Sequence, residues 1–335
     1  KRCWRRMGGR FGMRDHSAVL GRYLNLLFLL MVTIAYSKDI SPLYTLTASG
    51  LVSDFVVDEG RLYVATDEGS IDIFDLRTQK IVDRIVLDLI PASGGEWVPA
   101  AILSVDRMNG KTLFVSRGKG NYRDIWIHEG FKLKKVKGAE EKIFAKKARF
   151  TDDEHIFMGT FGSDIILYDR SEGYALYQSH ISPSAMGGMV LSEDRQTAVM
   201  ADESGAVRII DVGTSEIKQE FSSENLDNIY SVAYRGGVLL TASEDRRVGV
   251  YLATAKPYHL RSDFLVYAVA LSPSGEQGIY SSGTEQSLQL FNTRTGVKGD
   301  RLIGHLGIVN KIHFLTEKIL ISAGNEQNVY VWKLD

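Results

Sequence analysis

Cysteine is nearly absent from this 335-residue sequence, which contains only Cys3. Residues 4–335 therefore cannot form a disulfide framework, supply a thiolate nucleophile or bind a metal through cysteine. A body without cysteine is compatible with an oxidising compartment.

Recognisable catalytic and ligand-binding motifs are also missing. The seven histidines are scattered and form no pair or ligand set with metal-binding spacing. Gly110-Lys111-Thr112 ends like a phosphate-binding loop, but Val105 stands where that motif requires glycine. The sequence contains no Gly-x-Ser-x-Gly elbow. It therefore predicts no catalytic residue, no metal site and no cofactor.

The net charge of −1 hides an asymmetry. Residues 1–37 carry seven basic residues and one acidic residue, so residues 38–335 retain 33 basic and 40 acidic residues, a net charge of about −7. Such a body is not a general nucleic-acid binder by charge, and we predict no nucleic-acid partner.

Long apolar runs are rare, and the clearest one is Leu24–Tyr36. Arg14 and Arg22 precede it, and the small residues Ala35 and Ser37 occupy the −3 and −1 positions of a cleavage site before Lys38. This pattern is typical of a signal peptide, because a membrane-spanning helix needs about 20 apolar residues. We expect residues 1–37 to be an upstream segment plus a signal peptide, and the mature protein to be periplasmic and not an integral membrane protein. An uncleaved membrane anchor is the alternative.

The body of the chain repeats one unit seven times. Its most regular part is a strand of alternating β-branched residues that closes near an aromatic residue, with starts at Ser70, Asn121, Ser163, Ala206, Arg247, Ser287 and Asn328. These starts are 51, 42, 43, 41, 40 and 41 residues apart. A period of about 40–45 residues with four short strands per unit is typical of a β-propeller blade. We therefore predict an all-β, seven-bladed β-propeller over residues 38–335.

The last predicted blade ends without its outer strand, because the chain stops after Val329–Leu334. An unassigned strand, Pro42–Thr47, precedes the first blade. We predict that this N-terminal strand completes the last blade, which would leave no exposed edge there.

The repeats resemble the WD40 family. Val266–Gly275 is similar to the family's first-strand consensus, and Gly304-His305 and Trp332 match its signature positions in the last blade. The resemblance implies a structural tetrad of buried, hydrogen-bonded side chains: His305, Ser322, Glu326 and Trp332. Glutamate replaces the usual aspartate at 326, and the other blades lack the Gly-His pair. The exported, cysteine-free body, together with Ser49–Val57, is also similar to the L-type accessory proteins of bacterial periplasmic nitrate reductase clusters.

A propeller exposes two faces, and inserted loops on repeat scaffolds are often the binding parts. The 51-residue spacing indicates a long loop at Pro91–Pro99 that carries Trp97, and a long turn after Arg117. First-strand positions that share one register are Ser53, Gly187, Tyr230, Tyr267 and Asn310. We predict a partner-binding face formed by Trp97, Arg117, Tyr122, Arg123, Tyr230, Tyr267 and Asn310.

The basic run Lys132–Arg149 is interpreted as a solvated blade edge, with a docking patch for an acidic partner or anionic lipid as the alternative. The leading functional hypothesis is an exported, non-enzymatic and monomeric scaffold that binds a protein partner, such as a periplasmic reductase or its assembly factors. The alternative is a propeller enzyme or a small-ligand sensor that uses the central channel.

Overall fold

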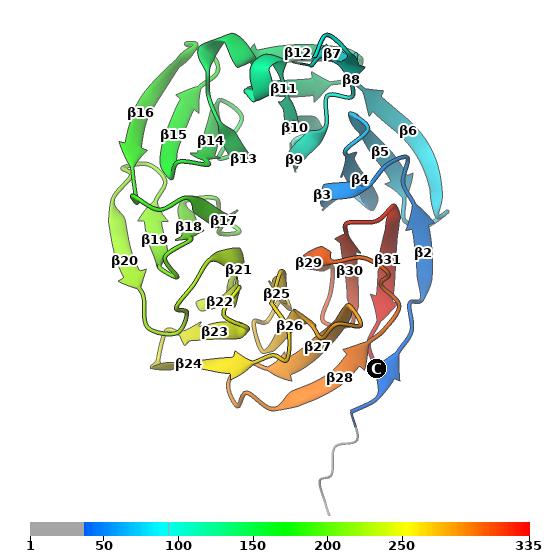
Figure 1. Ribbon diagram of the computed structural model, residues 1–335, viewed down its shortest axis with the longest axis vertical. Coiled ribbons are helices and arrows are strands. Elements are labelled where there is room, and N and C mark those ends of the chain that lie inside the picture. Colours follow the sequence, from blue (N-terminus) through cyan, green and yellow to red (C-terminus); the bar gives the residue numbers. More distant parts are fainter. Residues whose placement is uncertain (1–36, 93) are drawn as a thin grey trace, which may run out of the picture. The chain divides into compact units, whose positions relative to one another are not determined.

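A computed structural model describes residues 37–92 and 94–335, and within them the secondary structure is almost entirely β. Seven sheets surround a central channel, and the first strand of each blade lies nearest the centre (Figure 1). This is the seven-bladed β-propeller that the repeat predicts. The predicted signal segment Leu24–Tyr36 and the residues upstream of it lie outside the described residues.

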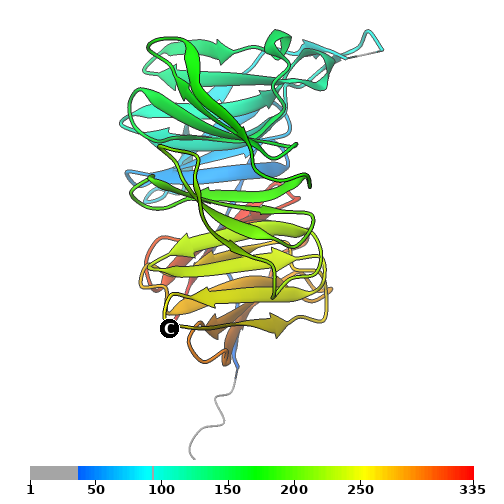
Figure 2. The ribbon, with the colours of Figure 1, turned by 90° about the vertical axis from the view of Figure 1, so that its left-hand side faces the viewer.

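Within each blade, successive strands pair antiparallel from the channel outward. Blade 1 comprises β3 (Val52–Asp58), β4 (Arg61–Thr66), β5 (Ser70–Asp75) and β6 (Lys80–Val86). Blade 2 comprises β9 (Ile102–Met108), β10 (Lys111–Arg117), β11 (Arg123–Glu129) and β12 (Lys132–Lys137). Blade 3 comprises β13 (Ala145–Phe150), β14 (His155–Thr160), β15 (Asp164–Asp169) and β16 (Tyr174–His180). The side view shows strands of neighbouring blades stacked on one another (Figure 2).

The remaining blades continue the same order. Blade 4 comprises β17 (Met186–Leu191), β18 (Thr197–Asp202), β19 (Val207–Asp211) and β20 (Ile217–Phe221), and blade 5 comprises β21 (Ile229–Arg235), β22 (Val238–Ser243), β23 (Arg247–Leu252) and β24 (Ala255–Arg261). Blade 6 comprises β25 (Val269–Leu271), β26 (Gln277–Ser282), β27 (Ser287–Asn292) and β28 (Lys298–Leu302). Blade 7 contains β29 (Val309–Phe314), β30 (Ile319–Gly324) and β31 (Asn328–Lys333).

The N-terminal segment closes the ring, as predicted. Strand β2 (Tyr44–Thr47) pairs antiparallel with β31 and becomes the outer strand of blade 7. A second short strand, β1 (Asp39–Ile40), pairs in parallel with β28 of blade 6. No sequence pattern predicts β1, because two residues are too few to show one.

Other departures from the sequence prediction are local. The long loop of blade 2 contains a two-stranded ribbon, β7 (Ile90–Pro91) with β8 (Trp97–Val98), and two short 3₁₀ turns follow, η1 (Lys119–Asn121) and η2 (Ala139–Glu141). The first strand of blade 6 is only Val269–Leu271, shorter than the stretch Val266–Gly275 that resembles the first-strand consensus of the WD40 family. The reason is that the amides of Tyr267 and Ala268 donate to the side chain of Ser281, at 2.8 and 3.1 Å, and leave the backbone ladder.

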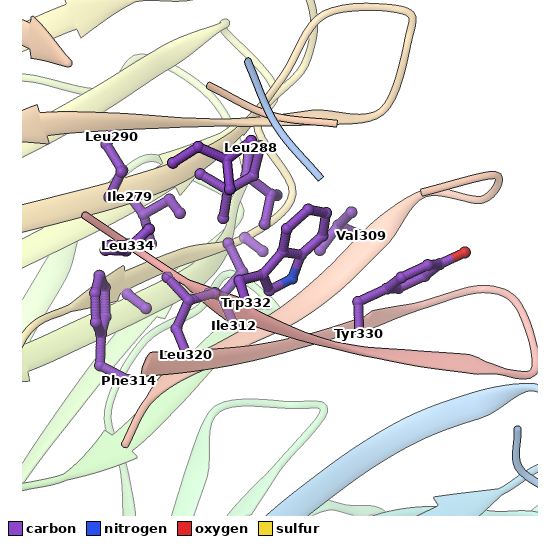
Figure 3. Packing of buried hydrophobic residues seen from close by; sticks show 14 residues of the cluster. Ile279, Leu288, Leu290, Val309, Ile312, Phe314, Leu320, Tyr330, Trp332 and Leu334 are labelled. Atoms are coloured by element: carbon purple, nitrogen blue, oxygen red, sulfur yellow. The ribbon is translucent and has the colours of Figure 1, made fainter. Parts of the chain in front are cut away.

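The core lies between blades. Second and third strands such as β4 and β5 are almost continuously buried, because neighbouring blades cover both of their sides, whereas the outer strand β6 is mostly exposed. The interface between blades 6 and 7 shows the packing: Leu288 and Ile279 of one blade lie close to Trp332 and Val309 of the next (Figure 3). Ile40 of β1 belongs to the same cluster, so the ring closure is also part of the core.

Candidate functional site

One face of the ring carries the connections between blades and the turns between the second and third strands of each blade. We call it the loop face. Trp97 lies in such a connection, Arg117 and Tyr122 flank such a turn, and Tyr230 and Asn310 begin the first strands of their blades. Antiparallel pairing places all of these positions on the loop face.

Large hydrophobic side chains are exposed unevenly on the two faces. Among the described residues, the loop face carries eight of them: Leu51, Leu89, Trp97, Phe144, Phe161, Leu226, Leu306 and Ile308. The turns of the opposite face carry two, Phe131 and Val297. The remainder lie on outer strands or beside β2. The loop face is therefore the more apolar of the two.

The ribbon of blade 2 forms the most exposed part of this face. Trp97 is 66% exposed, and Leu89, just before the ribbon, is 53% exposed. A groove of about 370 Å³ lies between the ribbon and the turn after β10, and Val98, Arg117 and Asn121 contribute to its lining. Figure 2 shows the ribbon extending beyond the stacked blades. An exposed indole beside a groove and an exposed guanidinium are the side chains that commonly anchor protein partners.

Two other predicted site residues in this turn have structural contacts. The ring of Tyr122 packs on Phe144 at a centroid distance of 4.7 Å. Arg123 is only 8% exposed; its guanidinium donates to the backbone carbonyls of Asn121 and Tyr122 and lies over the ring of Phe161. Burial lowers the pKa of Arg123, and the charge of Arg117 adds to this effect. Arg123 therefore shapes the turn and offers little surface to a partner.

The first-strand positions that share one register in the sequence coincide with a repeated β-bulge at the rim of the channel. In six blades the first strand has one extra residue near its start, opposite a continuous second strand. The extra residues, together with Tyr267 at the matching place in blade 6, are the rim residues: Ser53, Leu103, Lys146, Gly187, Tyr230, Tyr267 and Asn310. A bulge re-aims its side chain and occurs often beside functional sites.

Several rim residues contact the next blade. The hydroxyl of Ser53 donates to the carbonyl of Ile102, Lys146 Nζ donates to that of Met186 at 2.7 Å, and Asn310 Nδ2 donates to that of Val52 at 3.2 Å. Each contact runs from one blade to its successor around the ring. The rim is thus held together by side chains from the bulges.

Tyr230 and Tyr267 continue this pattern by stacking. Their ring centroids are 5.0 Å apart and the planes are inclined by 21°. The hydroxyl of Tyr230 donates to Glu244 Oε2 at 2.7 Å, and burial, followed by this hydrogen bond, raises the pKa of Tyr230. The structure brings these two tyrosines together, but it places them across the channel from the ribbon of blade 2 (Figure 1).

The four residues of the structural tetrad form one hydrogen-bonded network. His305 is 5% exposed and contacts Glu326 Oε1 through Nδ1 at 2.8 Å and Ser322 Oγ through Nε2 at 2.6 Å. Trp332 Nε1 donates to the same Ser322 oxygen at 2.7 Å. Burial lowers the pKa of His305 despite its contact with Glu326. The neutral ring suits a structural role in blade 7.

A second polar cluster, which the sequence did not reveal, lies at the channel. Asp54 of β3 is fully buried, and its carboxylate contacts Lys147 Nζ at 3.3 Å, Arg149 Nη2 at 3.4 Å and Lys311 Nζ. It also accepts a hydrogen bond from the amide of Val105 at 3.1 Å. Burial alone would raise the pKa of Asp54, but the charges of the three cations outweigh it and hold the pKa well below its usual range. We call these four residues the channel cluster.

The channel cluster corrects the interpretation of the basic run Lys132–Arg149 as a single blade edge. Lys132 and Lys134 do lie on β12, the outer strand of blade 2. Lys147 and Arg149 instead lie on β13, the innermost strand of blade 3, and line the channel. The run spans an outer strand, a connection and an inner strand, so charge spacing alone did not reveal which residues point inward.

Residues 37–92 and 94–335 contain neither a cluster of metal-ligating side chains nor a membrane-spanning helix. No group of three or more histidine, cysteine, aspartate or glutamate side chains in residues 37–92 and 94–335 is placed to hold a metal ion. Over the same residues, no helix has the length and apolar character needed to cross a membrane.

Comparison with known proteins supports the fold. No protein-family model matches the chain, and no curated protein matches its sequence. Among solved structures, the crystal structure of the Cps50 (Swd1) β-propeller domain of Myceliophteria thermophila is similar, with a TM-score of 0.69 and 14% sequence identity. The match covers 88% of this chain and 99% of the other. At this identity the likeness establishes a β-propeller fold and leaves function to the residues of the chain itself.

Proposed function

We propose that this chain is a non-enzymatic scaffold that binds a protein partner on its loop face. The observation that carries the proposal is the concentration of exposed hydrophobic side chains there, with eight against two on the opposite face among the described residues. Contiguous exposed apolar patches rimmed by polar residues mark interaction sites, and Leu89 and Trp97 lie on one and the same connection of this face. Propellers commonly serve as platforms for protein partners.

The arrangement of the anchors favours a folded partner over a short peptide. Trp97 and Arg117 lie on blade 2, whereas the stacked pair Tyr230 and Tyr267 lies on blades 5 and 6, across the channel mouth (Figure 1). A partner that contacts both areas must span the mouth of the channel. Aromatic residues that become fully desolvated at the centre of such an interface contribute most of the binding energy.

Replacing both Tyr230 and Tyr267 with alanine is expected to weaken partner binding by more than about 30-fold, because even one aromatic hot spot contributes about 2 kcal/mol or more. Pull-down of the partner, followed by titration with the purified partner, measures the change. Melting temperatures of the variant and the wild type establish whether the variant is folded.

The control variant carries Lys132→Glu and Lys134→Glu on the outer strand β12, where no ion pair involves either lysine among the described residues. Peripheral charges mainly alter the association rate, so this variant should retain the partner. Retention by the tyrosine variant together with loss by the lysine variant would place the binding site on the outer strand instead.

We also propose that the protein is exported and cleaved before Lys38. The support comes from the apolar run Leu24–Tyr36 and from the small residues Ala35 and Ser37 before the cleavage point. N-terminal sequencing of the secreted protein should begin at Lys38. Recovery of the intact segment from washed membranes would instead support an uncleaved anchor.

Within this function we propose a role as an accessory or maturation factor for a periplasmic redox enzyme such as nitrate reductase. The support is the similarity of Ser49–Val57 and of the cysteine-free body to the L-type accessory proteins. The pull-down above tests this role as well: recovery of a reductase or one of its assembly factors supports it, and a partner of another class contradicts it without affecting the scaffold function.

A further inference from the structure

The central channel contains a cavity of about 330 Å³ that is separate from the loop-face anchors of blade 2. First strands from blades 3 to 7 line it, and its charged lining residues are Lys147, Arg149, Glu193, Arg235 and Lys311. A volume of this size holds about ten water molecules, so it can accept a small solute but not a folded partner.

The cavity has an excess of positive charge. Arg235 and Glu193 neutralise each other at 2.5 Å. The other three cations, Lys147, Arg149 and Lys311, share one carboxylate, that of Asp54. His313 also lines the cavity, and burial, followed by the charges of Lys311 and Arg235, lowers its pKa to about 4, so the ring is neutral at pH 7. The channel cluster therefore carries two uncompensated positive charges.

The two ammonium groups have hydrogen-bonding capacity to spare. An ammonium group has three donors. Among the described residues, Lys147 and Lys311 each use one of them, to Asp54, and Lys311 also lies over the ring of Phe55. Burial lowers the pKa of Lys147, and lowers that of Lys311 to about 8, more than Asp54 raises either value. One carboxylate thus does not fully stabilise the charges around it.

We infer that the channel binds a small oxyanion with two negative charges, held by Lys147, Arg149 and Lys311. Such an anion would balance the excess charge and accept the unused donors. The two ammonium groups suit the oxygens of phosphate or of a dicarboxylate. Arg149 adds positive charge beside them, because its Nη1 already donates to Ser104 Oγ and to the carbonyls of Val105 and Ala148. The inference does not rest on the scaffold function, and it assigns the channel a ligand class of its own; Tyr230 and Asn310 of the loop face also line the cavity.

Isothermal titration of the full chain at pH 7 with inorganic phosphate, and separately with malonate, tests this inference and distinguishes the two sources of oxyanion. Ionic strength is held constant with sodium chloride. We expect saturable binding of one anion per chain for at least one of the two probes. Absence of saturable binding for both, up to about 10 mM, would overturn the inference.

Two variants test the location. Lys311→Met should weaken binding by at least about tenfold, because it removes a charged hydrogen-bond donor. Lys134→Met on the outer strand should leave binding unchanged. Asp54→Asn separates a ligand role from a structural one: by removing the competing carboxylate it should tighten anion binding, whereas a purely structural cluster would show weaker binding or none. Equal affinities in all the variants would overturn the assignment.

A second measurement on the wild-type chain does not depend on the folding of any variant. Acetic anhydride labelling followed by mass spectrometry should show that the bound anion slows acetylation of Lys147 and Lys311 but not of Lys134. Equal labelling of these lysines with and without the anion would place any bound anion elsewhere.

Discussion

Replacing Asp54 with alanine is expected to lower the free energy of unfolding by about 3–5 kcal/mol, because removal of one partner from a buried ion cluster leaves the others uncompensated. Here Lys147, Arg149 and Lys311 would lose their shared carboxylate. The amide of Val105 would also lose its acceptor. Equilibrium unfolding in urea measures the change.

The matched control is Asp153→Ala. Asp153 also forms a close ion pair, with Lys111 at 2.5 Å, but its side chain is 54% exposed. Exposed pairs contribute little to stability, so this variant should unfold at nearly the wild-type midpoint. Similar midpoints for the two variants would show that the channel cluster does not support the ring.

The pH dependence of the Asp54 effect has a definite sign. Because the folded-state pKa of Asp54 is depressed, the carboxylate contributes stability above its unfolded pKa of about 3.9. The contribution is lost as the pH falls below that value. The difference in stability between wild type and Asp54→Ala should therefore narrow under acid conditions.

Deleting residues 38–47 is expected to lower the free energy of unfolding by several kcal/mol, because two buried side chains and a strand ladder are lost together. Leu46 is 3% exposed and Ile40 is 8% exposed. The backbone amide of Leu43 also donates to the carbonyl of Val331 in blade 7, at 2.8 Å, and this bond would be lost. Urea unfolding of chains that begin at Lys38 and at Ala48 gives the comparison. Equal midpoints would show that the ring closes in another way.

Two point variants separate loss of burial from loss of the chain segment. Leu46→Ala should cost about 2–5 kcal/mol, since its side chain packs against blades 1 and 7. Leu43 lies in the same segment but is 55% exposed, so Leu43→Ala should have little effect.

The deletion of residues 38–47 also leaves β31 as an unpaired edge strand, so self-association of the deletion variant should rise with protein concentration.

The sequence predicted the fold well because each blade repeats the same burial pattern. Alternating β-branched residues in strands such as β5 and β31 gave both the period and the number of blades, and the missing outer strand of blade 7 pointed to the N-terminal segment. The strand boundaries could not be predicted where a side chain accepts a hydrogen bond that a backbone carbonyl of the neighbouring strand would otherwise accept. The amides of Tyr267 and Ala268 donate to the side chain of Ser281 instead of pairing within the sheet, and no residue pattern predicts this exchange.

The candidate site was predictable only in part. Register alignment found Tyr230 and Tyr267, because equivalent positions of a repeat share a place in space. The bulge that re-aims Tyr230 cannot be read from alternation, since it adds one residue without changing composition. The channel cluster was missed because Asp54, Lys147 and Lys311 come from three blades, about 93 and 257 residues apart in the chain from Asp54. Only the closed ring brings them together.

The bulges at the rim have a consequence for the entropy of binding. Ser53, Lys146 and Asn310 are each hydrogen-bonded to the next blade, and Tyr230 and Tyr267 are stacked on one another. These side chains have lost much of their rotamer freedom before any partner arrives. Immobilising a flexible side chain at an interface costs about 0.5–1.5 kcal/mol. Here the rim side chains become ordered when the chain folds, so this entropy is not lost again on binding. A partner that docks on the rim therefore meets a surface whose conformation is already set.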